Sequence, residues 1–152
     1  MKTMQQWFSE YAISHQNSTN QTIHYLCVPA IFFSIIGVVM CIPSSLLMRV
    51  SGLNNPLIVN WAVILLIPAL IFYLRLSFKV FIQMLLFSIL CIIGNYYISE
   101  KINLFLFSII LFIIAWAGQF YGHSIEGKKP SFLKDLQFLL IGPAWVFKKL
   151  FS

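Results

Sequence analysis

The chain has 152 residues, of which 60% are hydrophobic and 9% are charged, and it carries a formal net charge of +6. A soluble domain carries about 25% charged residues, so this composition excludes a soluble globule and indicates an integral membrane protein. The basic residues lie between apolar runs rather than in a solvated basic domain, which argues against nucleic-acid binding.

The first 25 residues are more polar than the runs that follow and hold two of the three histidines. Residues 2–15 place their apolar side chains at helical spacing, which predicts a short amphipathic helix lying against the membrane interface. Turn-forming and capping residues follow at positions 16–20, so we expect this helix to break there. Residues 2–25 therefore form one amphipathic segment that carries His15 and His24.

Four apolar runs follow. A bilayer core of about 30 Å needs roughly 20 residues of helix, and the runs cover residues 26–48, 57–74, 80–98 and 102–122. Short connections join them, so neighbouring helices should be antiparallel. The predicted fold is all-α: one membrane domain over residues 1–152, with a bundle of four transmembrane helices and interfacial helices at both ends.

The distribution of basic residues predicts the orientation of this bundle. One side would hold Lys2, Arg75, Lys79, Lys128, Lys129, Lys134, Lys148 and Lys149, and the other side only Arg49 and Lys101. Because basic residues concentrate on the cytoplasmic side of membrane proteins, both termini are expected in the cytoplasm. The membrane would be a bacterial inner membrane or the endoplasmic reticulum.

The C-terminal segment, residues 131–151, is apolar but is interrupted by Gly142–Pro143. Neither half is long enough to span a bilayer, so we expect two short interfacial or re-entrant helices. The alternative is a fifth membrane crossing, which would place Lys148 and Lys149 outside, against the charge rule.

The three histidines are predicted to meet at the cytoplasmic end of the bundle. His15 and His24 are nine residues apart, which puts them on opposite faces of an unbroken helix. The predicted break at residues 16–20 removes that obstacle. His123 lies at the end of the last long apolar run, so an even number of crossings returns it to the same side. The alternative is that the histidines are interfacial polar residues with no shared role.

Gln119, His123 and Glu126 share one helical face, because they are separated by four and then three residues. Two histidines with one carboxylate are typical of non-haem Fe(II) sites. Three histidines with an open coordination position fit zinc equally well. The residue types thus predict a metal site and leave iron and zinc open.

Two blocks of residues, one near each end of the chain, form a longer pattern. They consist of Tyr11, His15, Asn20, His24 and Pro29, followed by Gln119, Gly122, His123, Glu126, Pro130 and Gly142–Pro143. This pattern resembles the 2-hydroxy fatty acid dioxygenase family of small membrane proteins, and the resemblance spans nearly the whole chain.

The resemblance implies an Fe(II)-dependent dioxygenase that uses O2 to shorten 2-hydroxy fatty acids by one carbon, in fatty acid alpha-oxidation. It implies that three residues bind the metal and are catalytic, namely His15, His24 and His123. It further implies that Asn20, Gln119 and Glu126 complete or support the metal site. The substrate and membrane lipid would be the partners of the chain. Two other functions stay open: a non-catalytic lipid-binding or scaffold membrane protein, and a zinc-dependent membrane hydrolase.

Overall fold

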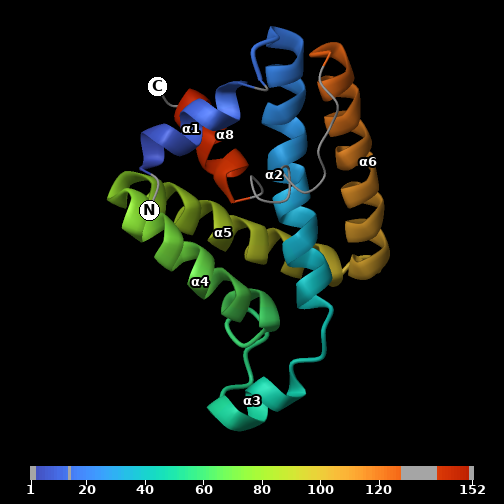
Figure 1. The fold of residues 1–152 in the computed structure, drawn as a ribbon. Helices are drawn as coiled ribbons and strands as arrows, with labels where there is room; N and C mark the ends of the chain where they lie inside the picture. The colour runs from blue at the N-terminus through green and yellow to red at the C-terminus, as the bar shows by residue number, and fades with distance from the viewer. Residues whose placement is uncertain (1–2, 14, 128–139, 151–152) are drawn as a thin grey trace.

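A computed structural model describes residues 3–13, 15–127 and 140–150. Within these residues the protein is all-helical, with seven α-helices and no strand, as predicted (Figure 1). The helices are α1 (Met4–Ile13), α2 (Ser18–Met40), α3 (Ser45–Ser51), α4 (Trp61–Leu76), α5 (Phe78–Ser99), α6 (Leu104–Ile125) and α8 (Ile141–Leu150).

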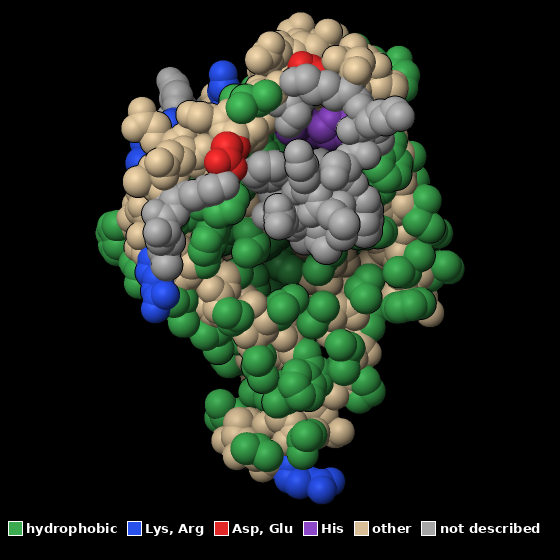
Figure 2. Space-filling model, in the orientation of Figure 1, with side chains coloured by type: hydrophobic (Ala, Val, Ile, Leu, Met, Phe, Trp, Pro, Cys, Tyr) green, Lys and Arg blue, Asp and Glu red, His purple; other side chains and the backbone are tan. Residues whose placement is uncertain are grey.

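Three of the described helices, α2, α5 and α6, are long and apolar enough to cross a membrane, with 23, 22 and 22 residues. The apolar helix α4 has 16 residues, about 24 Å at 1.5 Å per residue. Figure 2 shows hydrophobic side chains over much of one face, with charged side chains towards its edges and at the α3 tip. The protein therefore has the composition and helix lengths of a membrane protein.

The helix expected at residues 26–48 lies eight residues earlier, at Ser18–Met40. It starts early because the side chain of Asn17 accepts hydrogen bonds from the backbone N–H groups of Thr19 and Asn20, and so caps the helix. The chain leaves the helix before Pro43, and residues beyond it form the separate short helix α3. Hydropathy predicts a later start because the first two turns of α2 carry several polar residues, of which Asn20 and His24 are buried and Ser18, Thr19 and Thr22 are exposed.

The second expected run, residues 57–74, begins later than expected as a helix, at Trp61. The side chain of Asn60 accepts a hydrogen bond from the N–H of Val63 at 3.1 Å, which fixes this start by capping. The other two runs differ from the observed α5 and α6 by only a few residues at their ends.

Helices α2 and α6 lie side by side and antiparallel (Figure 1). Their close approach depends on small residues, as is common between membrane helices. A Cβ atom at Gly122 of α6 would clash with the side chain of Asn20 on α2, and one at Gly118 would lie 2.6 Å from Sγ of Cys27. Further along, a Cβ atom at Gly37 of α2 would clash with the side chain of Ser108 on α6.

Helix α8 packs against α1, α2 and α5, and residues 141–146 are all buried. The hydroxyl of Tyr73 on α4 donates a hydrogen bond to the carbonyl oxygen of Leu140 at 2.6 Å, which holds the start of α8. Gly142 and Pro143 were expected to separate two short helices but lie in the first turn of α8. Proline is tolerated there because first-turn N–H groups have no intrahelical partner. The rest of the predicted C-terminal pair, residues 131–139, lies outside the described residues.

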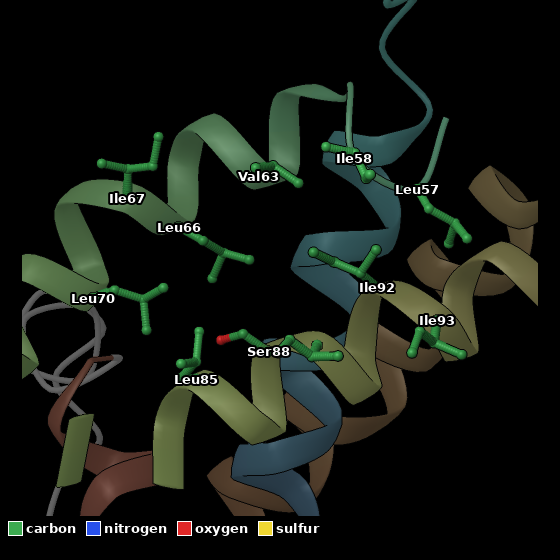
Figure 3. A pocket seen from close by; sticks show the side chains of 11 residues that line it. Leu57, Ile58, Val63, Leu66, Ile67, Leu70, Leu85, Ser88, Ile92 and Ile93 are labelled. Carbon is green, nitrogen blue, oxygen red and sulfur yellow. The ribbon is translucent and has the colours of Figure 1, made fainter. Parts of the chain in front are cut away.

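Helix α4 buries only Ala62, Leu66 and Tyr73. An apolar cavity of about 350 Å³ separates it from α5, and Figure 3 shows the aliphatic side chains and the one serine, Ser88, that line it. A second apolar cavity of about 330 Å³ lies between α4 and α2, and its lining includes Phe32 and Leu140. Apolar space is therefore available on both sides of α4.

The ends of the elements gather at two poles (Figure 1). Helices α1 and α8, the start of α2, the end of α6 and the turn between α4 and α5 lie at one pole, and α3 lies at the other. Segments from the beginning and the end of the chain therefore meet at the first pole.

Candidate metal centre

The three histidines come together at the pole formed by α1, α2, α6 and α8. His15 follows the end of α1, His24 lies in the second turn of α2, and His123 lies in the last turn of α6. One ligand nitrogen from each ring can be chosen so that all three lie within 4.8 Å of one another. The ring centroids are 4.2 Å apart for His15 and His24, 5.2 Å for His15 and His123, and 5.0 Å for His24 and His123.

The histidine cluster is buried. The exposed fractions of His15, His24 and His123 are 3%, 1% and 3%, and part of the histidine group is visible on the face that Figure 2 shows. Buried polar groups are normally hydrogen-bonded or bound to metals. The burial and grouping of the three imidazoles are therefore not what separate polar residues at a membrane interface would show.

The turn between α1 and α2 makes this meeting possible. The sequence predicted a helix break at residues 16–20, and the break falls between the end of α1 at Ile13 and the start of α2 at Ser18. The amide nitrogen Nε2 of Gln21 donates a hydrogen bond to the carbonyl oxygen of His15 at 2.8 Å. This contact fixes the backbone of His15 against the first turn of α2.

Two of the three rings are oriented by backbone carbonyls of their own segments. Nδ1 of His15 lies 2.6 Å from the carbonyl oxygen of Tyr11, and Nδ1 of His24 lies 2.9 Å from that of Asn20. Because a carbonyl oxygen can only accept, the shared proton belongs to Nδ1 in each ring. Metal-binding histidines usually donate their second N–H in this way, which leaves the lone pair of Nε2 as the ligand.

The environment of Nε2 of His24 indicates whether the cluster could hold a metal ion. It is buried, and among the described residues it has no hydrogen-bond partner. A buried nitrogen lone pair without a donor is costly, and a metal ion would satisfy it. The donor set of three imidazoles suits iron and zinc among the common metals.

The carboxylate of Glu126 joins the end of α6 to the turn that precedes α2. Oε1 accepts a hydrogen bond from the backbone N–H of Gln16, and Oε2 accepts one from the N–H of Asn17, both at 2.9 Å. Oε2 also accepts one from the side-chain amide of Asn20 at 2.9 Å. Sequence reasoning offered Glu126 and Asn20 as tentative ligands, and the described contacts give both a role in fastening the two histidine segments together.

Gln119, the third tentative ligand, is also buried, with 5% of its side chain exposed. It lies one helical turn before His123 on α6. The group of residues that could share a metal ion contains the three histidines and neither Glu126 nor any other described carboxylate.

Aromatic side chains wall the cluster on the side of α1 and α8. The Tyr11 ring stacks on His15 with a centroid distance of 4.0 Å and an interplanar angle of 7°. The Trp145 ring lies 5.8 Å from His15 and 5.1 Å from Tyr11. A Cβ atom at Gly142 would lie 3.3 Å from the Tyr11 hydroxyl, so α8 needs a small residue at this point to approach.

Trp145 lies beside the site although no pattern in the sequence predicts it there. The Gly142–Pro143 pair is compatible with a helix start that packs closely on its neighbours, because glycine permits close approach and proline is tolerated in a first turn, but it does not identify the side chain that lies beside His15.

The family comparison covers the whole chain. The model of one protein family, described as 2-hydroxy-palmitic acid dioxygenase Mpo1-like, matches residues 1–152. No curated protein and no solved structure matches the chain.

Proposed function

The chain belongs to the Mpo1-like family, and from this premise we propose that it is an Fe(II)-dependent dioxygenase that shortens 2-hydroxy fatty acids by one carbon. The observation that carries the proposal is the buried group of three histidines, whose ligand nitrogens lie within 4.8 Å of one another. The name of the family supports the substrate class and the use of O2.

His15, His24 and His123 would hold the metal. Iron bound there would supply redox chemistry with O2, and three neutral imidazole ligands leave coordination positions for other groups. The carbonyls of Tyr11 and Asn20 orient two of the rings, and Glu126 holds the segments that carry them. Tyr11 and Trp145 shield His15 from water.

We further propose that the bundle crosses the membrane four times, with both termini and the metal site on the cytoplasmic side. The excess of basic residues on that side supports this orientation. Helix α4, with 16 residues, would cross with its ends close to the two interfaces. The fatty acid, which partitions into the bilayer, could then approach the site from the cytoplasmic leaflet.

The cavity between α2 and α4 is our candidate for the acyl chain. Phe32 and Ile36 line it on α2, and they follow His24 by 8 and 12 residues on the same helix. At 1.5 Å per residue this is on the order of 12–18 Å along the helix axis, a span that a long acyl chain can cover. Leu140, which directly precedes α8, lines the same cavity.

The experiment that tests the proposal combines metal analysis with turnover. Full-length protein purified in detergent is loaded anaerobically with Fe(II) and assayed with 2-hydroxypalmitate under air, with and without a chelator. We expect bound iron and a fatty acid product one carbon shorter, both lost in His123→Ala. Ser124→Ala, at the exposed neighbouring position, is the matched control and should retain both.

The other possible results distinguish the proposed dioxygenase from the two alternative functions. Full turnover in the chelator or in His123→Ala would contradict the proposal. Stoichiometric zinc without oxygen consumption would favour a zinc-dependent hydrolase, because a three-histidine donor set equally suits zinc. Protein that binds no metal, and folds unchanged when all three histidines are replaced, would favour a lipid-binding or scaffold protein.

A further inference from the structure

A small pocket of about 190 Å³ opens where α1, α5 and α8 meet, apart from the histidine cluster. Its lining consists of Met4, Phe8, Ser77, Lys79, Val80, Gln83 and Lys148. Residues from three elements far apart in the sequence thus converge on one concave surface.

The polar part of this pocket is cationic. Lys79 comes from the first turn of α5 and Lys148 from the last turn of α8, and among the described residues that line the pocket none is acidic. Gln83 and Ser77 add uncharged hydrogen-bonding groups. Two ammonium groups beside neutral hydrogen-bonding groups favour an anion that carries several oxygen atoms, such as a phosphate.

The other part of the pocket is apolar. Phe8 and Val80 are buried, with 6% and 7% exposed, and Met4 lies beside them. Nζ of Lys148 lies 4.8 Å from the centroid of the Phe8 ring, so this lysine borders both parts. A free inorganic anion makes no use of such an apolar wall, whereas an amphipathic ligand does.

The pocket also lies at the level expected for a lipid headgroup. Lys79 is the second residue of α5, a helix long and apolar enough to span a membrane, so it lies where that span begins. Phe78 beside it is 68% exposed and could contact acyl chains. Basic residues at this depth attract anionic headgroups.

We propose that this pocket binds the phosphate of an anionic phospholipid headgroup between Lys79 and Lys148. The apolar wall of Met4, Phe8 and Val80 would contact the glycerol and the upper acyl chain. This proposal does not depend on the dioxygenase activity, because it concerns a different set of residues.

Occupancy of the pocket would have a structural consequence. A headgroup held between Lys79 and Lys148 would tie α5 to α8 across α1, and α1 and α8 carry Tyr11 and Trp145, which pack against His15. Anionic lipid should therefore stabilise the pole that contains the histidines.

The test compares lipid retention by native mass spectrometry. Delipidated full-length protein in detergent is titrated with equimolar phosphatidylglycerol and phosphatidylcholine, and the ratio of bound lipids is measured. Lys79→Gln/Lys148→Gln is compared with Arg75→Gln/Lys149→Gln, which removes the same charge from the same two regions but leaves the pocket lining intact. The single variants Lys79→Gln and Lys148→Gln give the same readout if the double variant folds poorly.

We expect the unmodified protein to retain one phosphatidylglycerol selectively. The preference should fall about fivefold for each pocket lysine removed, which corresponds to about 1 kcal/mol per basic residue near an anionic surface. The control double variant should retain most of the preference. Equal losses in both double variants, or no preference in the unmodified protein, would overturn the proposal. Displacement of the bound lipid by millimolar inorganic phosphate would instead assign the pocket to the free anion and overturn the lipid assignment.

Discussion

At the scale of single residues, Glu126 connects the two segments that carry the histidines of the candidate metal centre. Its carboxylate binds the N–H groups of Gln16 and Asn17 and the side chain of Asn20. The carbonyl oxygen of Asn20 in turn accepts from Nδ1 of His24. Glu126, on the segment of His123, therefore positions His24 through Asn20, and we treat it as a positioning residue.

The substitution Glu126→Gln should lower the affinity for the metal without changing which residues bind it. Glutamine has only one acceptor oxygen, and its amino group would face the N–H donors that the carboxylate now binds. At least one of the three hydrogen bonds from Gln16, Asn17 and Asn20 would therefore be lost. Loss of partners that orient metal ligands typically costs about 10–100-fold in metal affinity. The checks are metal titration and X-ray absorption spectroscopy of the loaded protein.

The matched control for this variant is Glu100→Gln, at an exposed position that follows α5. It should leave metal affinity unchanged. If the absorption spectrum of Glu126→Gln showed a lost oxygen ligand, Glu126 would bind the metal directly and the positioning role would be wrong.

At the scale of helices, the contact between α2 and α6 sets the distance between His24 and His123. The glycines at this contact leave no space for a Cβ atom. The side chains with which an added Cβ atom would clash differ from one glycine to the next. At Gly122 the neighbour is Asn20, next to the metal centre, whereas at Gly37 the neighbours are Ser108 and Asn95, deep in the bundle.

Gly122→Ala and Gly37→Ala should therefore have different effects. Both should lower the melting temperature in detergent, because overpacking of this kind typically costs about 1–3 kcal/mol. Only Gly122→Ala should also lower metal affinity, because it displaces Asn20. In Gly94→Ala the added Cβ would lie 3.0 Å from the Phe33 ring, a side chain that can move, so this variant should be mild. Equal metal affinity in the two severe variants would contradict the proposed role of the contact.

The cavity between α2 and α4 permits a test of substrate length. Ala69 lines this cavity, so Ala69→Trp should fill part of it and lower kcat/KM for 2-hydroxypalmitate more than for 2-hydroxyoctanoate. Ile64→Trp, at an exposed position of the same helix that does not line the cavity, is the control. An equal effect on both substrates would place the acyl chain elsewhere.

Several elements could be predicted from the sequence because their signals are local. Apolar runs indicated the long helices, and the turn residues after Ile13 indicated the break that brings His15 towards His24. The bounds of α2 could not be predicted from hydropathy, because polar residues interrupt the apolar pattern in its first turns, and the buried ones, Asn20 and His24, lie at the contact with α6. The insertion of Trp145 beside His15 could not be predicted either, because it depends on how α8 packs against three other helices.

At the scale of the whole molecule, the proposed four crossings would place the two poles on opposite sides of the membrane. The described ends of α1 and α6 meet at the histidine cluster, while α3 and the turn between α5 and α6 lie away from it (Figure 1). In the proposed topology α4 also crosses, although with 16 residues it is shorter than the three helices that are long enough to span a membrane.

Labelling of single cysteines checks this topology. In a background without Cys27, Cys41 and Cys91, cysteine is introduced by Ser9→Cys, Ser51→Cys, Ser99→Cys or Ser124→Cys, all at exposed positions. An impermeant maleimide should reach positions 51 and 99 from outside intact cells, and positions 9 and 124 only after lysis. Labelling of positions 51 and 99 from different sides would show that α4 does not cross.

Because α2 and α6 lie far apart in the sequence, their pairing determines when during translation the histidine cluster can form. His15 and His24 leave the ribosome about one hundred residues before His123, and domains synthesised at about 5–20 residues per second would expose the first two for several seconds without the third. No product of translation that ends before residue 123 contains all three histidines. The candidate centre can therefore form only after α6 has been made, so chains that end before residue 123 would be inactive rather than partly active.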